Sequence, residues 1–137
     1  MQEQRPSVIA VDDGRVVGYA LVVTQEVRKG LPFISDLFDE IDQISYRGSL
    51  LAGTDYVVVG QLCVDKDYRG QGLVNRLYAS FRASLEEHYS CGVTDIARAN
   101  RRSLKAHQKV GFEVIHAIEY EGLTWDVVLW DWSESGR

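Results

Sequence analysis

Two periods of apolar residues alternate along the chain. Alternation every second residue predicts strands, and recurrence every three to four residues predicts amphipathic helices. Strands are predicted over residues 7–11, 15–23, 56–64, 93–99, 112–120 and 124–132. Helices are predicted over residues 31–44, 72–89 and 101–110. Residues 46–55, which include two glycines, are predicted as a connection, and Asp12, Asp13 and Gly14 as a hairpin turn.

The order of these elements predicts an α/β (α+β) fold with a mixed central sheet flanked by helices. Residues 56–64 are almost continuously apolar, which is typical of a central strand covered on both faces. Gly60 interrupts this strand and indicates a bulge or a close approach of another backbone. With 137 residues, the chain is predicted to form a single domain over 1–137.

The composition narrows the classes of function. A net charge of −5 disfavours non-specific binding to nucleic acid or to an anionic membrane. Two cysteines provide no disulfide framework, and the three histidines lack the spacing of metal ligands. The first residues contain no apolar signal-peptide core, and no apolar run is long enough to span a bilayer. We therefore expect a cytoplasmic protein without a metal.

The segment "YRGQGLVNRLY" joins the central strand to the next helix and contains two glycines. The first N–H groups of a helix have no intrahelical partner and favour an anion, and glycines let a phosphate approach them. Arg69 adds a positive charge. The same glycines would also suit a simple tight turn. No Gly-Lys-Ser/Thr follows, and the three spaced glycines of the dinucleotide fingerprint are absent.

Together with "NRRSLKAHQKVGF" about thirty positions later, this segment resembles the GNAT superfamily of acyl-CoA-dependent N-acetyltransferases. The family pattern Gln/Arg-x-x-Gly-x-Gly/Ala is matched by Arg69 and Gly72, whereas Val74 stands where Gly or Ala is usual. Asn100, Ser103, Gly111 and Phe112 match the second motif. The resemblance covers roughly residues 8–132. It implies a mostly antiparallel sheet. The chain departs from the family in a shortened N-terminus, since members usually have a strand and one or two helices before the first hairpin. Residues 24–53 are longer than a hairpin connection needs, and from that length alone we expect them to cover the acceptor site.

The resemblance also implies where acetyl-CoA would bind as cosubstrate. The pantetheine arm would lie along the backbone of Leu62, Cys63 and Val64. The amide of Leu62 would polarise the thioester carbonyl as an oxyanion-type donor. The pyrophosphate would lie on the backbone amides of the glycine segment, which comprises Arg69, Gly70, Gln71, Gly72, Leu73 and Val74.

His107 occupies the position at which many family members carry a tyrosine that protonates the departing thiolate. Histidine, with an ordinary pKa of about 6.5, could donate a proton near neutrality. The alternatives are a contact with CoA without proton transfer and a purely structural role. Tyr68 and Tyr120 are secondary candidates for the donor. Asn100 is expected to cap the helix 101–110 and to contact pantetheine, and Ser103 to reach a phosphate or simply to lie on the surface.

The sequence names no general base. The candidate carboxylates are Glu119 and Glu121 in a late strand and Asp36, Asp39 and Glu40 in the predicted cover helix, and all are more typical of a solvated face. Cys63 is interpreted as an apolar core residue rather than a nucleophile. The three tryptophans are assigned to the core or to contacts in a homodimer.

The leading hypothesis is direct transfer of acetyl from acetyl-CoA to a primary amine of a small molecule or peptide. A CoA-binding sensor or interaction domain without turnover is the alternative. A nucleotide-binding module unrelated to CoA is a third hypothesis. The acceptor and the acyl chain length are left open, because acceptor contacts come from variable loops.

Overall fold

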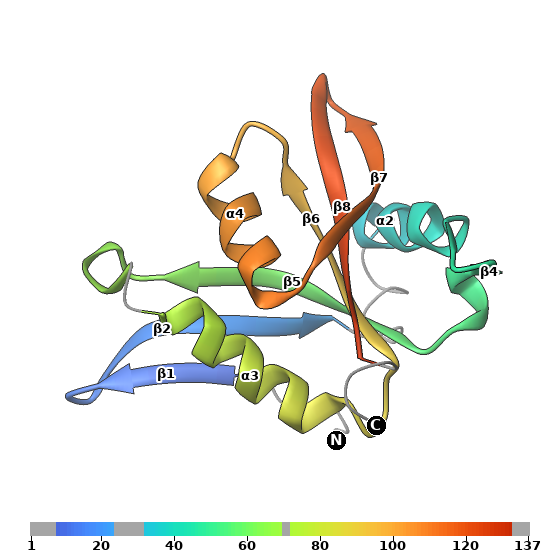
Figure 1. The fold of residues 1–137 in the computed structure, drawn as a ribbon. Helices are drawn as coiled ribbons and strands as arrows, with labels where there is room; N and C mark the ends of the chain where they lie inside the picture. The colour runs from blue at the N-terminus through green and yellow to red at the C-terminus, as the bar shows by residue number, and fades with distance from the viewer. Residues whose placement is uncertain (1–7, 24–31, 70–71, 133–137) are drawn as a thin grey trace.

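We describe the fold from a computed structural model, in which residues 8–23, 32–69 and 72–132 are described (Figure 1). In chain order the elements are β1 (Val8–Asp12), β2 (Arg15–Val23), α2 (Pro32–Asp42), β3 (Ser45–Tyr46), β4 (Ser49–Leu50), β5 (Tyr56–Val64), α3 (Leu73–Leu85), β6 (Cys91–Ala97), α4 (Arg101–Val110), β7 (Glu113–Tyr120) and β8 (Leu123–Asp131). Short 3-10 turns follow β4 and β5. No helix among these residues is long and apolar enough to cross a membrane.

The main sheet has six strands in the order β1-β2-β5-β6-β8-β7. Only the β5–β6 pair is parallel, and the other neighbours pair antiparallel. This confirms the predicted mixed, mostly antiparallel sheet. The parallel pair requires a crossover connection, and α3 provides it. The β5 bounds predicted from the apolar run, Tyr56–Val64, are those observed.

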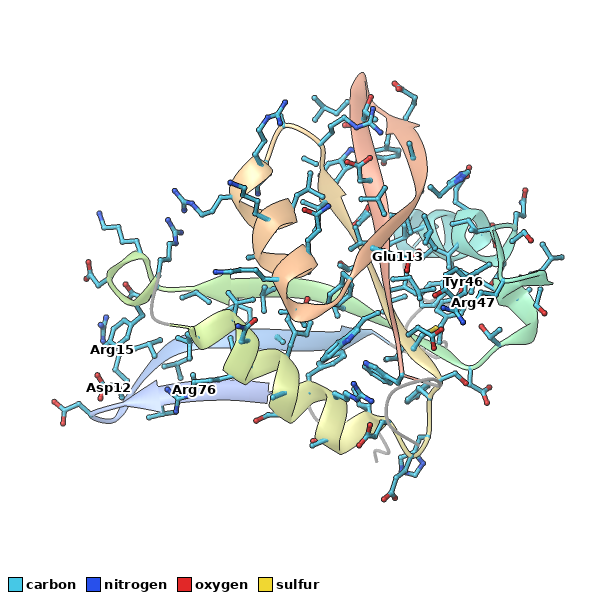
Figure 2. All side chains as sticks on the ribbon, viewed as in Figure 1. Asp12, Arg15, Tyr46, Arg47, Arg76 and Glu113 are labelled. Atoms are coloured by element: carbon cyan, nitrogen blue, oxygen red, sulfur yellow. The ribbon has the colours of Figure 1, made fainter. Side chains whose placement is uncertain are left out.

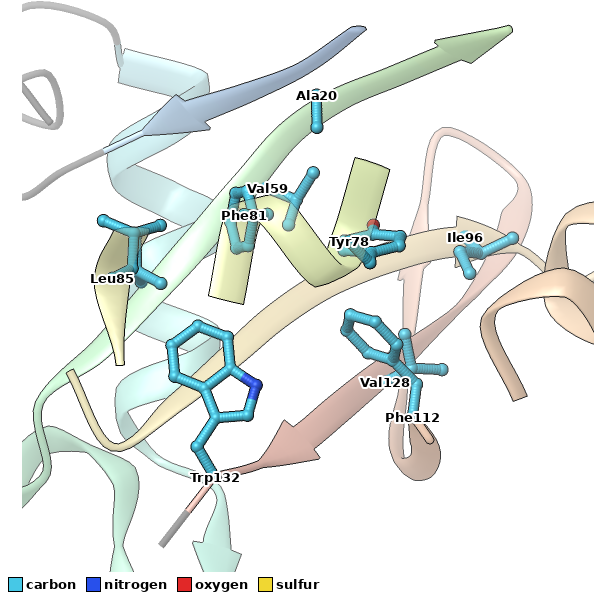
Figure 3. Close-up of a cluster of buried hydrophobic side chains, with 10 residues drawn as sticks. Ala20, Val59, Tyr78, Phe81, Leu85, Ile96, Phe112, Val128 and Trp132 are labelled. Atoms are coloured by element: carbon cyan, nitrogen blue, oxygen red, sulfur yellow. The ribbon is translucent and has the colours of Figure 1, made fainter. Parts of the chain in front are cut away.

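Helices cover both faces of the sheet (Figure 1). One apolar cluster joins α3 and Phe112, with part-buried side chains of α4, to one face, and Figure 3 shows its members around Tyr78 and Phe81. A second cluster joins α2 to the opposite face through Phe38 and Ile41. We call these the α3/α4 face and the α2 face. Successive residues of β5 alternate between the two clusters, which explains the unbroken apolar run of the sequence.

Two short segments differ from the sequence-based prediction. The predicted connection contains the hairpin β3–β4, whose turn is formed by Arg47 and Gly48, both at positive φ. This geometry is that of a two-residue hairpin turn. The connection is also fixed by a hydrogen bond of 3.2 Å from the Tyr46 hydroxyl to the Asp131 carboxylate.

The helix α3 ends at Leu85, earlier than the predicted Tyr89, and β6 begins at Cys91. The sequence pattern began this strand at Val93 and read Gly92 as part of the helix end before it, whereas the residue lies inside β6. Its lack of a side chain has a packing reason, because a Cβ there would lie 3.3 Å from the Trp132 ring. A glycine that permits close packing and a glycine that ends a helix look alike in a single sequence.

Candidate active site

The strands β5 and β6 pair over only part of their length. Parallel pairing runs from Tyr56 opposite Cys91 to Val58 opposite Val93, and no further pair between them is formed. The strand β5 then continues to Val64 with β2 as its partner. On the side facing β6, the backbone of residues 60–64 therefore forms a free strand edge inside the sheet, which is a surface that an extended molecule can join by hydrogen bonding.

Gly60 lies where this free edge begins. In the register with β2, Leu21 pairs with Gln61 and Val22 pairs with Val59, so Gly60 is the extra residue of a β-bulge. The bulge predicted from this glycine is thus confirmed. Across the separating strands, the Thr94 hydroxyl donates a 2.9 Å hydrogen bond to the Val59 carbonyl and replaces the backbone ladder that ends there. We call the separation of β5 from β6 beyond Val58 and Val93 the gap. The bulge at Gly60 and the hydrogen bond of Thr94 lie where it begins.

The N-terminus of α3 follows β5 by way of a short 3-10 turn. Gly72 adopts a left-handed conformation with φ of 76°, and a Cβ at this position would meet no atom within 4 Å. The amides of the first helical turn have no partner within the helix, as the anion-site interpretation requires. The side chain of Val74 packs against the α3/α4 cluster, so its bulk is directed to the core. Gly70 and Gln71 lie outside the described residues.

Two contacts hold the segment between β5 and α3 against the turn of the β1–β2 hairpin. The Tyr68 hydroxyl donates a short hydrogen bond to the Asp12 carboxylate, and Arg15 forms an ion pair of 3.3 Å with Asp65. Figure 2 shows Asp12 and Arg15 at this end of the molecule. The hydrogen bond to Asp12 is the main reason why the pKa of Tyr68 is raised, which disfavours its release of a proton. Arg69 is exposed at the end of this segment.

The helix α4 begins with the predicted cap. The Asn100 side chain accepts a 3.2 Å hydrogen bond from the Ser103 amide, which confirms Asn100 as the N-cap. His107 lies one turn further along and is 2% exposed. The Ser103 carbonyl can only accept, so Nδ1 of His107 carries the proton of their 2.8 Å hydrogen bond. Nε2 then accepts the 2.8 Å hydrogen bond from the Tyr78 hydroxyl.

Both nitrogens of His107 are therefore engaged inside the protein. The ring also makes edge contacts with the rings of Tyr78 and Phe112. Burial lowers the pKa of His107 from its ordinary value of 6.5, and the hydrogen bond to Ser103 opposes this only in part. Burial likewise raises the pKa of Tyr78. His107 is thus mostly neutral at neutral pH, and proton donation to the thiolate, one of the three roles that the sequence left open, stays a prediction.

A carboxylate on β6 was missed by the sequence analysis. Asp95 is half-buried, and no side chain of the described residues forms a hydrogen bond or ion pair with it. Burial raises the pKa of its carboxyl from the ordinary value of 3.8, and a hydrogen bond from its own amide opposes this only in part. Val93 and Asp95 share one face of β6, and Val93 belongs to the α2 cluster. The available signal was a lone acid in the otherwise apolar strand "CGVTDIA".

Two acids on the neighbouring strands β8 and β7 have side-chain partners. Asp126 is 4% exposed and forms a two-pronged ion pair with Arg98, with a shortest distance of 2.6 Å. Of the acids that the sequence analysis considered, Glu119 accepts a hydrogen bond from Thr124. No three His, Cys, Asp or Glu side chains of the described ranges gather as a metal site would require.

The backbone of Leu62, Cys63 and Val64 lies on the free edge of β5, in register with β2. The Leu62 side chain packs against the α3/α4 cluster, and its amide belongs to the strand segment that β6 does not pair. The free edge of β5 and the first turn of α3 therefore follow each other in the chain, with only the short 3-10 turn and its flanking residues between them.

Comparison with known proteins identifies the family. The sequence model of the acetyltransferase (GNAT) family matches residues 1–112, and the chain belongs to this family of acetyltransferases, which use acetyl-CoA. The resemblance inferred from the two motifs is confirmed. No curated protein sequence matches the chain.

Solved structures share the fold at low sequence identity. The ribosomal-protein-S18-alanine N-acetyltransferase from Escherichia coli has 14% identity and a TM-score of 0.66, over 99% of this chain and 75% of that one. The structure of the protein yncA from Salmonella typhimurium, with its cofactor acetyl-CoA, has 19% identity and a TM-score of 0.64, over 96% of this chain and 67% of that one. An N-acetyltransferase from Staphylococcus aureus Mu50 has 18% identity and a TM-score of 0.62, over 88% of this chain and 67% of that one.

Proposed function

We propose that this chain transfers an acetyl group from acetyl-CoA directly to a primary amine, within the cytoplasm. The observation that carries the proposal is the free edge of β5 beside the first turn of α3. An extended pantetheine arm can join that edge as an added strand, while a pyrophosphate accepts hydrogen bonds from the helix amides. Family membership supports the same cosubstrate.

The described residues fit such a molecule on two counts. At Gly72 there is open space where a Cβ would stand, so a phosphate can approach the backbone closely. Arg69 is exposed at the same end of α3 and supplies a positive charge. We propose that the pyrophosphate is held by Arg69, by the backbone at Gly72 and by the first-turn amides of Leu73 and Val74. Gly70 and Gln71, which lie outside the described residues, are proposed to contribute as well.

Acetyl-CoA supplies a thioester, and the chain supplies the surroundings in which an amine attacks it. The Leu62 amide is proposed to face the thioester oxygen, where a fixed donor stabilises developing negative charge. Asn100 is proposed to contact the pantetheine arm while it caps α4, and Ser103 to lie near the cosubstrate. We assign His107 a positioning role, since its hydrogen bond with Tyr78 joins α4 to α3, and its hydrogen bond to the Ser103 carbonyl within α4 orients the ring.

Measuring thiol release and cosubstrate binding together tests the proposal. Purified protein is titrated with acetyl-CoA by calorimetry and then assayed for CoA thiol release with a panel of primary amines. We expect binding and amine-dependent release. Binding without release on any amine would favour a CoA-binding sensor, and stabilisation by ATP or NAD but not by CoA would favour an unrelated nucleotide-binding module.

A further inference from the structure

The proposed reaction needs a group that takes a proton from the amine, and the structure offers one on the α2 face. We propose that Asp95 is this catalytic base and that the acceptor is a primary amine joined to an apolar group. The inference rests on the proposed function and adds the residue and the class of acceptor to it.

The position of Asp95 relative to the gap is the first support. The last parallel pair is Val58 with Val93, and Asp95 is two residues further along β6, which is about 6.6 Å of strand. Asp95 therefore lies where β6 has separated from β5. The helix α3, whose first turn is the proposed phosphate site, covers the opposite face. An amine can then approach the gap from the α2 face without displacing the cosubstrate.

The lack of a partner is the second support. A carboxylate with little access to solvent normally acquires hydrogen bonds from other residues or a cation, as the buried Asp126 does with Arg98. Asp95 accepts a hydrogen bond from its own amide but has no side-chain partner among the described residues, so its charge is left for a ligand. An ammonium group is the complementary ligand. The desolvation that raises the pKa of Asp95 also makes it a stronger base.

The surface beyond Asp95 supports an apolar substituent. Trp125 pairs with Ala97 and Ile118, and Asp95 pairs with Val127, so Trp125 and Ile118 share the face of Asp95. The indole N–H of Trp125 is buried and has no acceptor among the described residues, which leaves a donor for an oxygen of the ligand.

The same face continues to the end of the β7–β8 hairpin, which projects past α2 and α4 in Figure 1. There the paired side chains of Tyr120 and Leu123 are 47% and 55% exposed. Together with Trp125 and Ile118, these residues form a path of apolar side chains that leads to the carboxylate. Such a surface favours an amine on an aliphatic or aromatic group over a polyamine.

In the proposed step, an N–H proton passes from the amine to a carboxylate oxygen of Asp95. The nitrogen lone pair forms the N–C bond to the acetyl carbon, and the C–S bond breaks with its electron pair on sulfur. The products are the amide, the CoA thiolate and protonated Asp95. Asp95 then releases its proton to the thiolate or to water, and the balance requires no further reactant.

The experiment compares the wild type with Asp95→Asn and Asp95→Glu. The control is Glu113→Gln, which removes an exposed carboxylate on the same face, opposite Leu129. Each protein is assayed with phenethylamine, phenylalaninamide, spermidine and Nα-acetyl-lysine at several pH values, and acetyl-CoA affinity is measured by calorimetry. We expect Asp95→Asn to lower kcat about a hundredfold or more and to remove the acidic limb of the pH profile. Acetyl-CoA affinity and Glu113→Gln activity should match the wild type.

The possible failures are distinguishable. If acetyl-CoA does not bind the wild type, the proposed function itself is overturned. If it binds and only spermidine or acetyl-lysine is acetylated, or no amine at all, the apolar acceptor class is wrong. If apolar amines are acetylated and Asp95→Asn keeps the wild-type kcat and pH profile, Asp95 is not the base. Asp95→Glu keeps the carboxylate and should retain more activity than Asp95→Asn; the reverse order would also contradict the role.

Discussion

His107 and Asp95 lie on opposite faces of one sheet, and both are titratable groups in a poorly solvated position. On the α3/α4 face, His107 has each ring nitrogen hydrogen-bonded, and aromatic rings surround it. On the α2 face, Asp95 has no side-chain partner among the described residues. From the sequence, proton donation was one of three roles considered for the histidine, and the aspartate was overlooked.

The contrast between these two residues separates polar groups that stabilise the fold from polar groups that are free to react. A group whose hydrogen bonds are all satisfied inside the fold stabilises the fold, and its protonation is opposed by its surroundings. A group left unpaired in a low-dielectric position lowers stability, and a site that keeps such a group has a use for it.

The largest effect is expected from His107→Ala. The change removes a buried ring and leaves the Tyr78 hydroxyl and the Ser103 carbonyl without partners, which should lower the free energy of unfolding by about 3 kcal/mol. Urea denaturation measures this. His107→Gln, which can restore one hydrogen bond, should recover part of the loss. Unchanged stability together with a large fall in kcat and an altered pH–rate profile would instead return His107 to the role of proton donor.

The next effect concerns the cosubstrate segment. Gly72→Ala places a side chain at a φ of 76°, which costs about 1–2 kcal/mol and shifts the first amides of α3. Acetyl-CoA affinity measured by calorimetry should fall about tenfold. Gly48→Ala is the matched control, because Gly48 has a φ of 85° and equally open space in the β3–β4 turn. Equal affinities in the two variants would contradict the phosphate site.

His107 and Asp95 should change the free energy of unfolding in opposite directions as pH falls. The pKa of His107 is lowered in the folded state, so the unfolded chain binds a proton more readily, and His107 reduces stability as pH falls below 6.5. The pKa of Asp95 is raised, so its charge lowers stability at neutral pH, and that penalty disappears as pH falls through the folded-state pKa toward 3.8.

Asp95→Asn should therefore have a higher free energy of unfolding than the wild type at pH 7, and this difference should shrink on acidification. His107→Gln should lose less of its free energy of unfolding than the wild type as pH falls below 6.5. Urea denaturation across this pH range measures both profiles. Destabilisation by Asp95→Asn at pH 7 would indicate that Asp95 has a structural partner, which would remove the contrast with His107.

The smallest effect is expected at the point where the strands separate. Thr94→Val keeps the branched shape and removes the hydrogen bond to the Val59 carbonyl, which should cost about 1 kcal/mol. Thermal denaturation measures the loss, and Thr94→Ser is the control that keeps the hydroxyl. If Thr94→Val is as stable as Thr94→Ser and binds acetyl-CoA equally well, this bond does not shape the gap.

Most of the fold could be predicted from local pattern. The bounds of β2, β5 and α4, the bulge at Gly60 and the Asn100 cap all follow from signals within a few residues. The hairpin β3–β4 was missed because its turn places Arg47 at positive φ, which a non-glycine residue rarely adopts. The start of β6 was missed because the role of Gly92 is set by Trp132, which is distant in sequence.

The family, the order of elements and the segment on which a phosphate would lie could be read from the sequence, because each depends on residues close together in the chain. Only the tertiary structure decided where β5 and β6 separate, which partners His107 acquires and which face carries Asp95. These features depend on hydrogen bonds and packing between elements far apart in sequence. The physical state of a titratable group is set by burial and partners, and neither can be read from its neighbours in the chain.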